Sequence, residues 1–374
     1  AGSGVDGYLS GVTIYSDNDQ DGELSAGDSV AIANATGGFK MYGGNGPLIM
    51  YGGTDISTGL DFGVQYEAPA GYSIINPISS LVRAVQRDAE ANSVSLNNSS
   101  AYEVVRAAIY FANAGVTASQ APNYDPFSAA ANASSAALAN TAVEYQRVAA
   151  AIATVVEVVS EAMVAIDVRD GLDNSISLNQ KTASVLVFDA IISAIKTNAI
   201  DDGGLLTNLA DTESGGFLDT LLTSVSSHAS TALTSDQIAQ AVTIIGTAMT
   251  TIANASGSNA IGSLTEITKV QLVAQGEAGA DLALYLKGDI SAPAFSAETF
   301  STAVSDAAVG VVVPVSYSIS EALSNASVLE GQNGETSNLE FLVTRGGNTS
   351  VTSTIEWVVS GGAMLDASHF AFNA

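Results

Sequence analysis

The chain has 374 residues and no cysteine, and its 38 acidic residues against 11 basic ones give a formal net charge of −27. A negative field of this size repels nucleic acid and anionic membrane surfaces, and it attracts divalent cations. Nucleic-acid binding is therefore excluded as a function, and the lack of cysteine excludes disulfides and thiolate chemistry. The length allows two or three domains, each with its own core.

Residues 1–75 have the pattern of short strands separated by glycine pairs. The β-type runs lie at residues 8–15, 29–33, 39–42, 48–51 and 64–67. Gly-rich turns such as Gly43-Gly44 separate them, as in small antiparallel sheets. The sequence therefore predicts a small N-terminal antiparallel β-sandwich over residues 1–75.

The stretch 17–28 has the spacing of an EF-hand calcium loop. Its oxygen-bearing side chains stand at positions one, three, five, nine and twelve, namely Asp17, Asp19, Asp21, Ser25 and Asp28. Gly22 at position six permits the sharp turn, and Glu23 at position seven would contribute its backbone carbonyl. A strand precedes the loop where an EF-hand has a helix, so the resemblance covers the loop alone.

An oxygen-only ligand set favours calcium over zinc or copper, so Ca²⁺ is the predicted cofactor. Position twelve holds an aspartate where EF-hands usually have glutamate. The alternative interpretation is an ordinary solvated turn, because Asp, Asn and Gly are common in turns.

Residues 76–291 change to helical periodicity. Asn76 can cap a helix whose first turn contains Pro77, and apolar residues then recur at helical spacing. Further helical stretches are expected at residues 101–114, 134–166, 181–198, 217–227, 235–253 and 264–275. Their high alanine content predicts close helix–helix approach in a central bundle.

Charges interrupt the most apolar helical stretch, residues 149–166. Glu157 and Glu161 are four residues apart and are interpreted as the polar face of that helix. The interrupted stretch falls short of a bilayer span, so no membrane insertion is expected.

The C-terminal part is predicted to return to β structure, with a linker over residues 292–314 and a β-module over residues 315–374. The start Val328-Leu329-Glu330-Gly331, the strand and turn 341–347, and Ile355-Glu356-Trp357 resemble the first half of a Calx-β module. That resemblance implies a partial immunoglobulin-like sandwich with calcium at one end, and Glu330 and Asp366 as further candidate ligands. His369 stands where the module usually has aspartate.

The order of these parts, including Tyr124-Asp125-Pro126, resembles a unit of very large secreted bacterial surface proteins, the adhesins and biofilm-matrix proteins. The resemblance implies an extracellular location at the bacterial cell surface. It also implies copies of the chain or adjacent modules as partners, and modules that stiffen when calcium is bound.

No catalytic constellation is found, and the chain is predicted not to be an enzyme. The two histidines, His228 and His369, do not neighbour a serine in a nucleophile-elbow pattern. Asp167, Asp170 and Asp173 are candidates for a second calcium loop, although their spacing matches no standard one.

The sequence thus favours a calcium-dependent extracellular structural protein that assembles through its β-modules. An incomplete C-terminal sandwich would expose strand edges, which a strand from another subunit could pair. The alternative is a calcium-dependent module that binds surface glycans. It requires exposed aromatics beside the acidic loop, with Tyr8, Tyr15 and Tyr42 as candidates.

Overall fold

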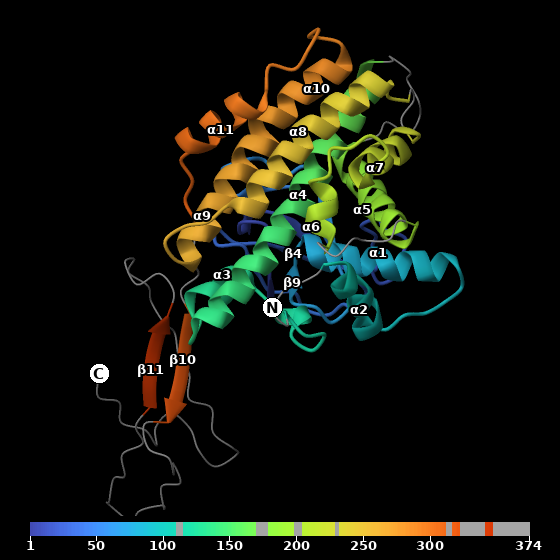
Figure 1. Ribbon diagram of the computed structural model, residues 1–374. Coiled ribbons are helices and arrows are strands. Elements are labelled where there is room, and N and C mark those ends of the chain that lie inside the picture. The colour runs from blue at the N-terminus through green and yellow to red at the C-terminus, as the bar shows by residue number, and fades with distance from the viewer. Residues whose placement is uncertain are drawn as a thin grey trace, which may run out of the picture. The chain divides into compact units, whose positions relative to one another are not determined.

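The computed structural model describes residues 1–109, 115–169, 179–197, 204–228 and 232–311, together with the strands 316–321 and 341–346. The chain divides into two compact units, Ala1–Pro314 and Val315–Ala374. Helices account for most of the first unit, and short strands from its N-terminal part lie against them (Figure 1).

The strands of the first unit form three small sheets. The strands are β1 (Gly2–Gly4), β2 (Leu9–Ser10), β3 (Thr13–Ser16), β4 (Ser29–Ile32), β5 (Gly38–Phe39), β6 (Leu48–Tyr51), β7 (Thr54–Asp55), β8 (Gln65–Ala68) and β9 (Ile74–Ile75). The largest sheet is antiparallel with the order β4-β3-β6-β8. A second has the order β5-β1-β9, in which β1 and β9 are parallel, and β2 pairs with β7.

The helices follow the strands in the chain. They are α1 (Pro77–Ala91), α2 (Asn98–Ala108), η1 (Ala121–Asn123), α3 (Pro126–Ala131), α4 (Ala136–Arg169), α5 (Gln180–Thr197), α6 (Gly204–Leu209), α7 (Phe217–Ser226), α8 (Ser235–Asn254), α9 (Ala260–Gln271), the π-helical segment η2 (Leu272–Ala278), α10 (Gly279–Lys287) and α11 (Ala297–Asp306). The predicted start at Asn76 is confirmed, because its side chain accepts a hydrogen bond from the Ser79 amide (2.8 Å).

Helix α4 is the central helix of the first unit and contacts α3, α5, α8, α9 and α10 (Figure 1). Its residues Ala150, Ala151 and Ala153 are fully buried, and such small side chains let neighbouring helices approach closely. The segment Ala136–Ile166 is long and apolar enough to cross a bilayer, contrary to the expectation from sequence. Because 78% of its most apolar window is buried inside the protein, it has the character of a core helix.

The predicted fold of a separate N-terminal β-sandwich followed by a bundle is wrong. The described chain is about 55% helical, and its sheets have only two to four strands. Strand residues such as Met50 and helix residues such as Ile152 belong to one continuous buried cluster. Strands this few and short cannot cover their own apolar faces, so they pack on helices; the Tyr66 ring, for example, lies 6.0 Å from that of Phe188 in α5.

The second unit is described only at β10 (Ser316–Glu321) and β11 (Phe341–Gly346), which pair antiparallel. The remaining residues of the predicted Calx-β-like sandwich lie outside the described ones. Within the segment 292–314, which sequence predicts as a linker, helix α11 forms and buries Phe300.

Candidate metal centre

The loop 17–28 connects two neighbouring strands of the largest sheet. Ser16, the last residue of β3, pairs with Ser29, the first residue of β4, so the twelve residues between them form the hairpin connection. Hairpin loops are usually two to five residues long, and a loop of this length needs its own interactions to hold a fixed shape.

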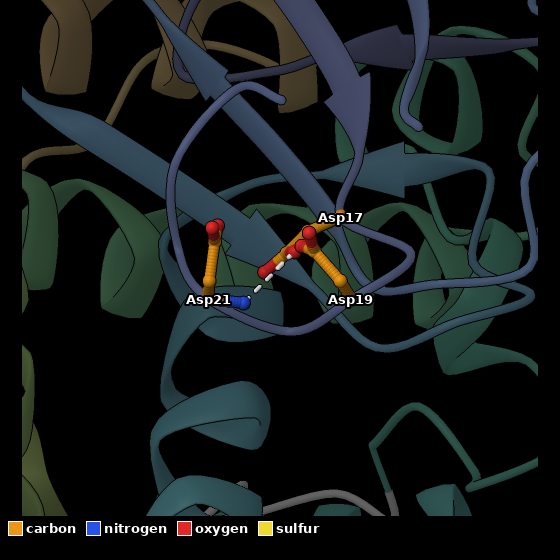
Figure 2. A group of neighbouring side chains, drawn as sticks. All are labelled: Asp17, Asp19 and Asp21. Atoms are coloured by element: carbon orange, nitrogen blue, oxygen red, sulfur yellow. Dashed lines mark hydrogen bonds between the residues drawn. The ribbon is translucent and has the colours of Figure 1, made fainter. Parts of the chain in front are cut away.

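Three carboxylates of the loop converge at its base. Asp17, Asp19 and Asp21 each place one oxygen so that the three atoms lie within 4.8 Å of one another. Figure 2 shows the Asp17 and Asp19 carboxylates next to each other and the Asp21 side chain facing them. Within the described part of the chain, none of the three forms an ion pair with a basic side chain. Such an arrangement of hard oxygen donors can hold a metal ion.

Backbone amides fix the Asp17 carboxylate, which is 3% exposed as a residue. It accepts hydrogen bonds from the amides of Asp21 (3.2 Å) and Gly22 (3.1 Å). Burial raises the pKa of Asp17, and these amide hydrogen bonds act in the opposite direction. Gly22 has φ 79°, a left-handed conformation that favours glycine, and its carbonyl accepts a hydrogen bond from the Tyr15 hydroxyl (2.8 Å).

A second loop, residues 45–47, supports the acidic loop through hydrogen bonds. The Asn18 side-chain carbonyl accepts hydrogen bonds from the amides of Asn45 (2.9 Å) and Gly46 (3.1 Å). The Asp17 amide donates to the Pro47 carbonyl (2.9 Å). Gly46 lies so close that a Cβ atom there would come within 1.8 Å of the Asp17 carbonyl oxygen. The position of Asp17 thus depends on a residue almost thirty positions further along the chain.

Asp28, predicted as a ligand at position twelve, is not part of the three-carboxylate cluster. Its two oxygens accept hydrogen bonds from the amides of Asn18 (2.9 Å) and Ser25 (2.8 Å), and these bonds lower its pKa. Asp28 therefore joins the two ends of the loop. The Ser25 hydroxyl, at position nine, donates to the Asp19 carboxylate (3.3 Å), so it does lie at the cluster.

The Glu23 side chain links the loop to helix α5. Its carboxylate lies 3.3 Å from the Lys181 ammonium, which also stands over the rings of Tyr15 (6.0 Å) and Tyr51 (4.8 Å). The Glu23 carboxylate therefore contacts Lys181 and is not part of the three-carboxylate cluster. The contact ties the loop to the helical part of the same unit.

The other candidate ligands lie outside the described residues. This applies to Glu330 and Asp366 of the C-terminal region, and to Asp170 and Asp173 of the possible second calcium loop.

Sequence reasoning missed a group of buried acids in the interior. Asp6 accepts hydrogen bonds from the Tyr66 hydroxyl (2.9 Å) and the Gln271 amide (2.8 Å), and its backbone carbonyl accepts one from Gln146 (2.9 Å). Burial, together with the charge of Asp55, raises the pKa of Asp6 to about 7. Asp6 stands alone between Val5 and Gly7, so no motif in the sequence indicates that its side chain is buried.

Glu157 and Glu161, interpreted from their spacing as the polar face of their helix, lie on a face that is largely covered by the rest of the protein. Both side chains are only partly exposed. Burial and the charges of Asp6 and Asp55 raise the pKa of Glu157 well above its ordinary value, and burial raises that of Glu161. Their environment comes from segments distant in sequence, which the i, i+4 spacing does not reveal.

The tyrosines proposed for glycan contact are mostly inaccessible. Tyr8 and Tyr15 are 2% and 0% exposed, so they cannot stack on a sugar. Tyr42 is 77% exposed, with the Lys40 ammonium 5.0 Å from its ring centre. His228 is exposed just after the end of α7, where its ring nitrogen lies 3.2 Å from the Ser224 carbonyl oxygen.

Comparisons of this chain with protein-family models, with curated proteins and with solved structures find no match. The resemblances to a Calx-β module and to bacterial surface adhesins therefore stay predictions.

Proposed function

We propose that residues 17–28 bind one calcium ion and that the chain is a calcium-dependent structural protein of the bacterial cell surface. One observation carries the proposal. Carboxylates spaced as in a calcium-binding loop lie with their oxygens within 4.8 Å of one another, although the sequence motif sits in a β-hairpin and not between helices.

The donor set fits calcium better than other biological cations. Asp17, Asp19 and Asp21 would supply carboxylate oxygens, and Glu23 its backbone carbonyl. Calcium accepts six to eight oxygen ligands in flexible geometry, whereas magnesium needs a near-ideal octahedron and zinc prefers nitrogen and sulfur. Asp28 would complete the shell if its oxygens gave up their amide hydrogen bonds. The bound ion would supply positive charge, and the chain's own residues would set the shape of the loop.

The mechanical consequence follows from where the loop is attached. Its two ends continue directly into β3 and β4, and Glu23 connects it to α5 through Lys181. Neutralising the clustered carboxylates would order this hairpin and fix it against the helices. In a chain with net charge −27 it would also reduce repulsion between copies or adjacent modules in an adhesin, matrix fibre or surface layer.

Isothermal titration calorimetry with calcium tests the binding step. The double variant Asp19→Asn, Asp21→Asn keeps the size of both exposed side chains and removes two charges. We expect the native chain to release binding heat and to melt at a higher temperature with calcium than with chelator, and the variant to lose both effects. The matched control is Asp61→Asn, which changes an exposed aspartate away from the loop.

Equal heats for the double variant and the native chain would contradict the assignment of the ion to this loop. Magnesium at the same concentration serves as the cation control, and it should give a clearly weaker response.

Assembly through the C-terminal β-module is a separate part of this proposal. The described part of that module is a two-stranded antiparallel pair, and two strands alone are marginally stable in water. Deleting residues 315–374 should remove calcium-dependent polymers seen by electron microscopy. Undiminished polymers after the deletion would contradict strand addition at this module.

A further inference from the structure

The two edge strands of the largest sheet, β8 and β4, differ in whether their outward backbone groups are hydrogen-bonded. At the β8 edge, helix side chains take the outward backbone groups. The Gln65 amide donates to the Ser184 hydroxyl of α5 (2.9 Å), and the Glu67 amide donates to the Ser80 hydroxyl of α1 (2.8 Å). That edge is therefore closed to any further strand.

The β4 edge is open. The Ala33 amide donates to the Val12 carbonyl (3.0 Å), so Ala33 and, two residues earlier, Ala31 direct their backbone groups toward β3. Val30 and Ile32 consequently direct theirs away from the sheet. In the described ranges, no residue forms a hydrogen bond with the outward backbone groups of these two.

The side chains of this edge are apolar and accessible. Val30 is 49% exposed and Ile32 is 68% exposed, and both project from the same face because they are two residues apart. Residues 29–33 contain no charge and no proline. Sheet edges that stay unpaired usually carry lysine, proline or a bulge as protection, and this strand has none of these within it.

We propose that the β4 edge pairs antiparallel with the β4 edge of a second copy of this chain, forming a two-fold symmetric dimer. With the two-fold axis at Ala31, Val30 of each copy lies opposite Ile32 of the other. Both pairs then exchange their outward backbone hydrogen bonds, and their exposed side chains meet across the new strand pair. A two-fold interface requires such self-complementarity, and this short strand provides it.

The charges beside the strand are compatible with a second copy. In this register Asp28, at the end of the acidic loop, faces the uncharged Asn34 of the second copy, so the pairing places no two like charges opposite each other.

The inference deepens the proposed function and rests on it for one feature, the dependence on calcium. Asp28 immediately precedes Ser29, so an ordered loop fixes the first residue of the pairing strand. We therefore expect the dimer to be tighter with calcium than with chelator.

Sedimentation equilibrium of the full chain over a concentration series, with calcium and with chelator, tests the dimer. The variant Ile32→Lys places a charge at the centre of the pair and should reduce the mass to that of the monomer. Leu138→Lys is the matched control, because Leu138 is 53% exposed on α4, and it should leave the dimer intact.

A native chain that stays monomeric with calcium would overturn the inference, as would a dimer that survives Ile32→Lys. Calorimetric calcium binding by the same variants separates the two proposals. Calcium binding by a monomeric native chain would refute the dimer and leave the metal site standing. A dimer formed without any calcium binding would support the edge pairing and refute the metal site.

Discussion

The buried carboxyl of Asp6 should make the stability of this protein fall as the pH rises from its ordinary pKa of 3.8 to about 7. The perturbation is Asp6→Asn, which keeps the shape of the side chain and removes its titration. The side chains of Tyr66 and Gln271 both donate hydrogen bonds to the Asp6 carboxyl group (2.9 and 2.8 Å). The asparagine of the variant keeps one acceptor oxygen for these two donors and replaces the other oxygen with an NH₂ group, which is itself a donor. We expect a loss of about 1 kcal/mol at low pH from this mismatch.

The magnitude at higher pH follows from the pKa. Asp6 has an ordinary pKa of 3.8, raised to about 7 in the folded chain, so folding favours its protonated form. Its stabilisation is fully present below the unfolded-state pKa and is lost as the pH rises through about 7. That pKa difference corresponds to about 4 kcal/mol. The amide of the variant carries no such dependence, and the loss of the charge also relieves Glu157, whose pKa is raised in part by Asp6.

The assay is urea unfolding of both chains at a series of pH values from acid to mildly alkaline, at constant calcium. The native chain should lose stability more steeply than Asp6→Asn, so that the variant becomes the more stable of the two above neutral pH. Asp61→Asn, at an exposed site, should follow the native curve. Parallel curves for the native chain and Asp6→Asn would refute the reasoning that a buried charge develops at this position.

Three further substitutions test how the acidic loop is held. Gly22→Ala should cost about 1–2 kcal/mol and weaken calcium binding in calorimetry, because Gly22 has φ 79°. Gly46→Ala should displace the Asp17 backbone, since the new Cβ would lie 1.8 Å from its carbonyl oxygen; we expect loss of about 1–3 kcal/mol in urea unfolding. Lys181→Gln removes the partner of Glu23 and should lower the free energy of unfolding by less than about 1 kcal/mol, with a smaller effect at high salt.

Local sequence signals predicted the longer helices of the fold and missed α3, α6, α10 and α11. Asn76 and Pro77 specify a helix start through capping and a preset φ, and α1 begins there. Thr234 caps α8 in the same way, through a hydrogen bond with Gln237 (3.3 Å) that completes a capping box. These signals involve residues within one turn of each other, so they act whatever the rest of the chain does.

The N-terminal strands were located approximately, but their packing was not predictable. Alternating apolar residues show that one strand face is buried, and they do not show what covers it. In this protein helices cover it, and hydroxyls of Ser80 and Ser184 close one sheet edge. Ser184 lies 119 residues from Gln65, and neither serine belongs to a recognisable sequence pattern.

The candidate site shows the same division between local and distant signals. The carboxylates of Asp17, Asp19 and Asp21 come together because they stand at alternate positions and the chain makes a tight turn at Gly22. The different role of Asp28 depends on which loop amides lack partners, and spacing cannot show that. The buried position of Asp6 depends on Gln271, which lies 265 residues away.

Hydrogen–deuterium exchange of the full chain, with calcium and with chelator, is the most direct measurement of the central claim. Ion binding within the loop should slow exchange in peptides covering residues 17–28 and the adjoining β3 and β4, and it should leave α8 unchanged. Exchange in that loop that is the same with calcium and with chelator would contradict the account, and so would protection that appears only elsewhere in the chain.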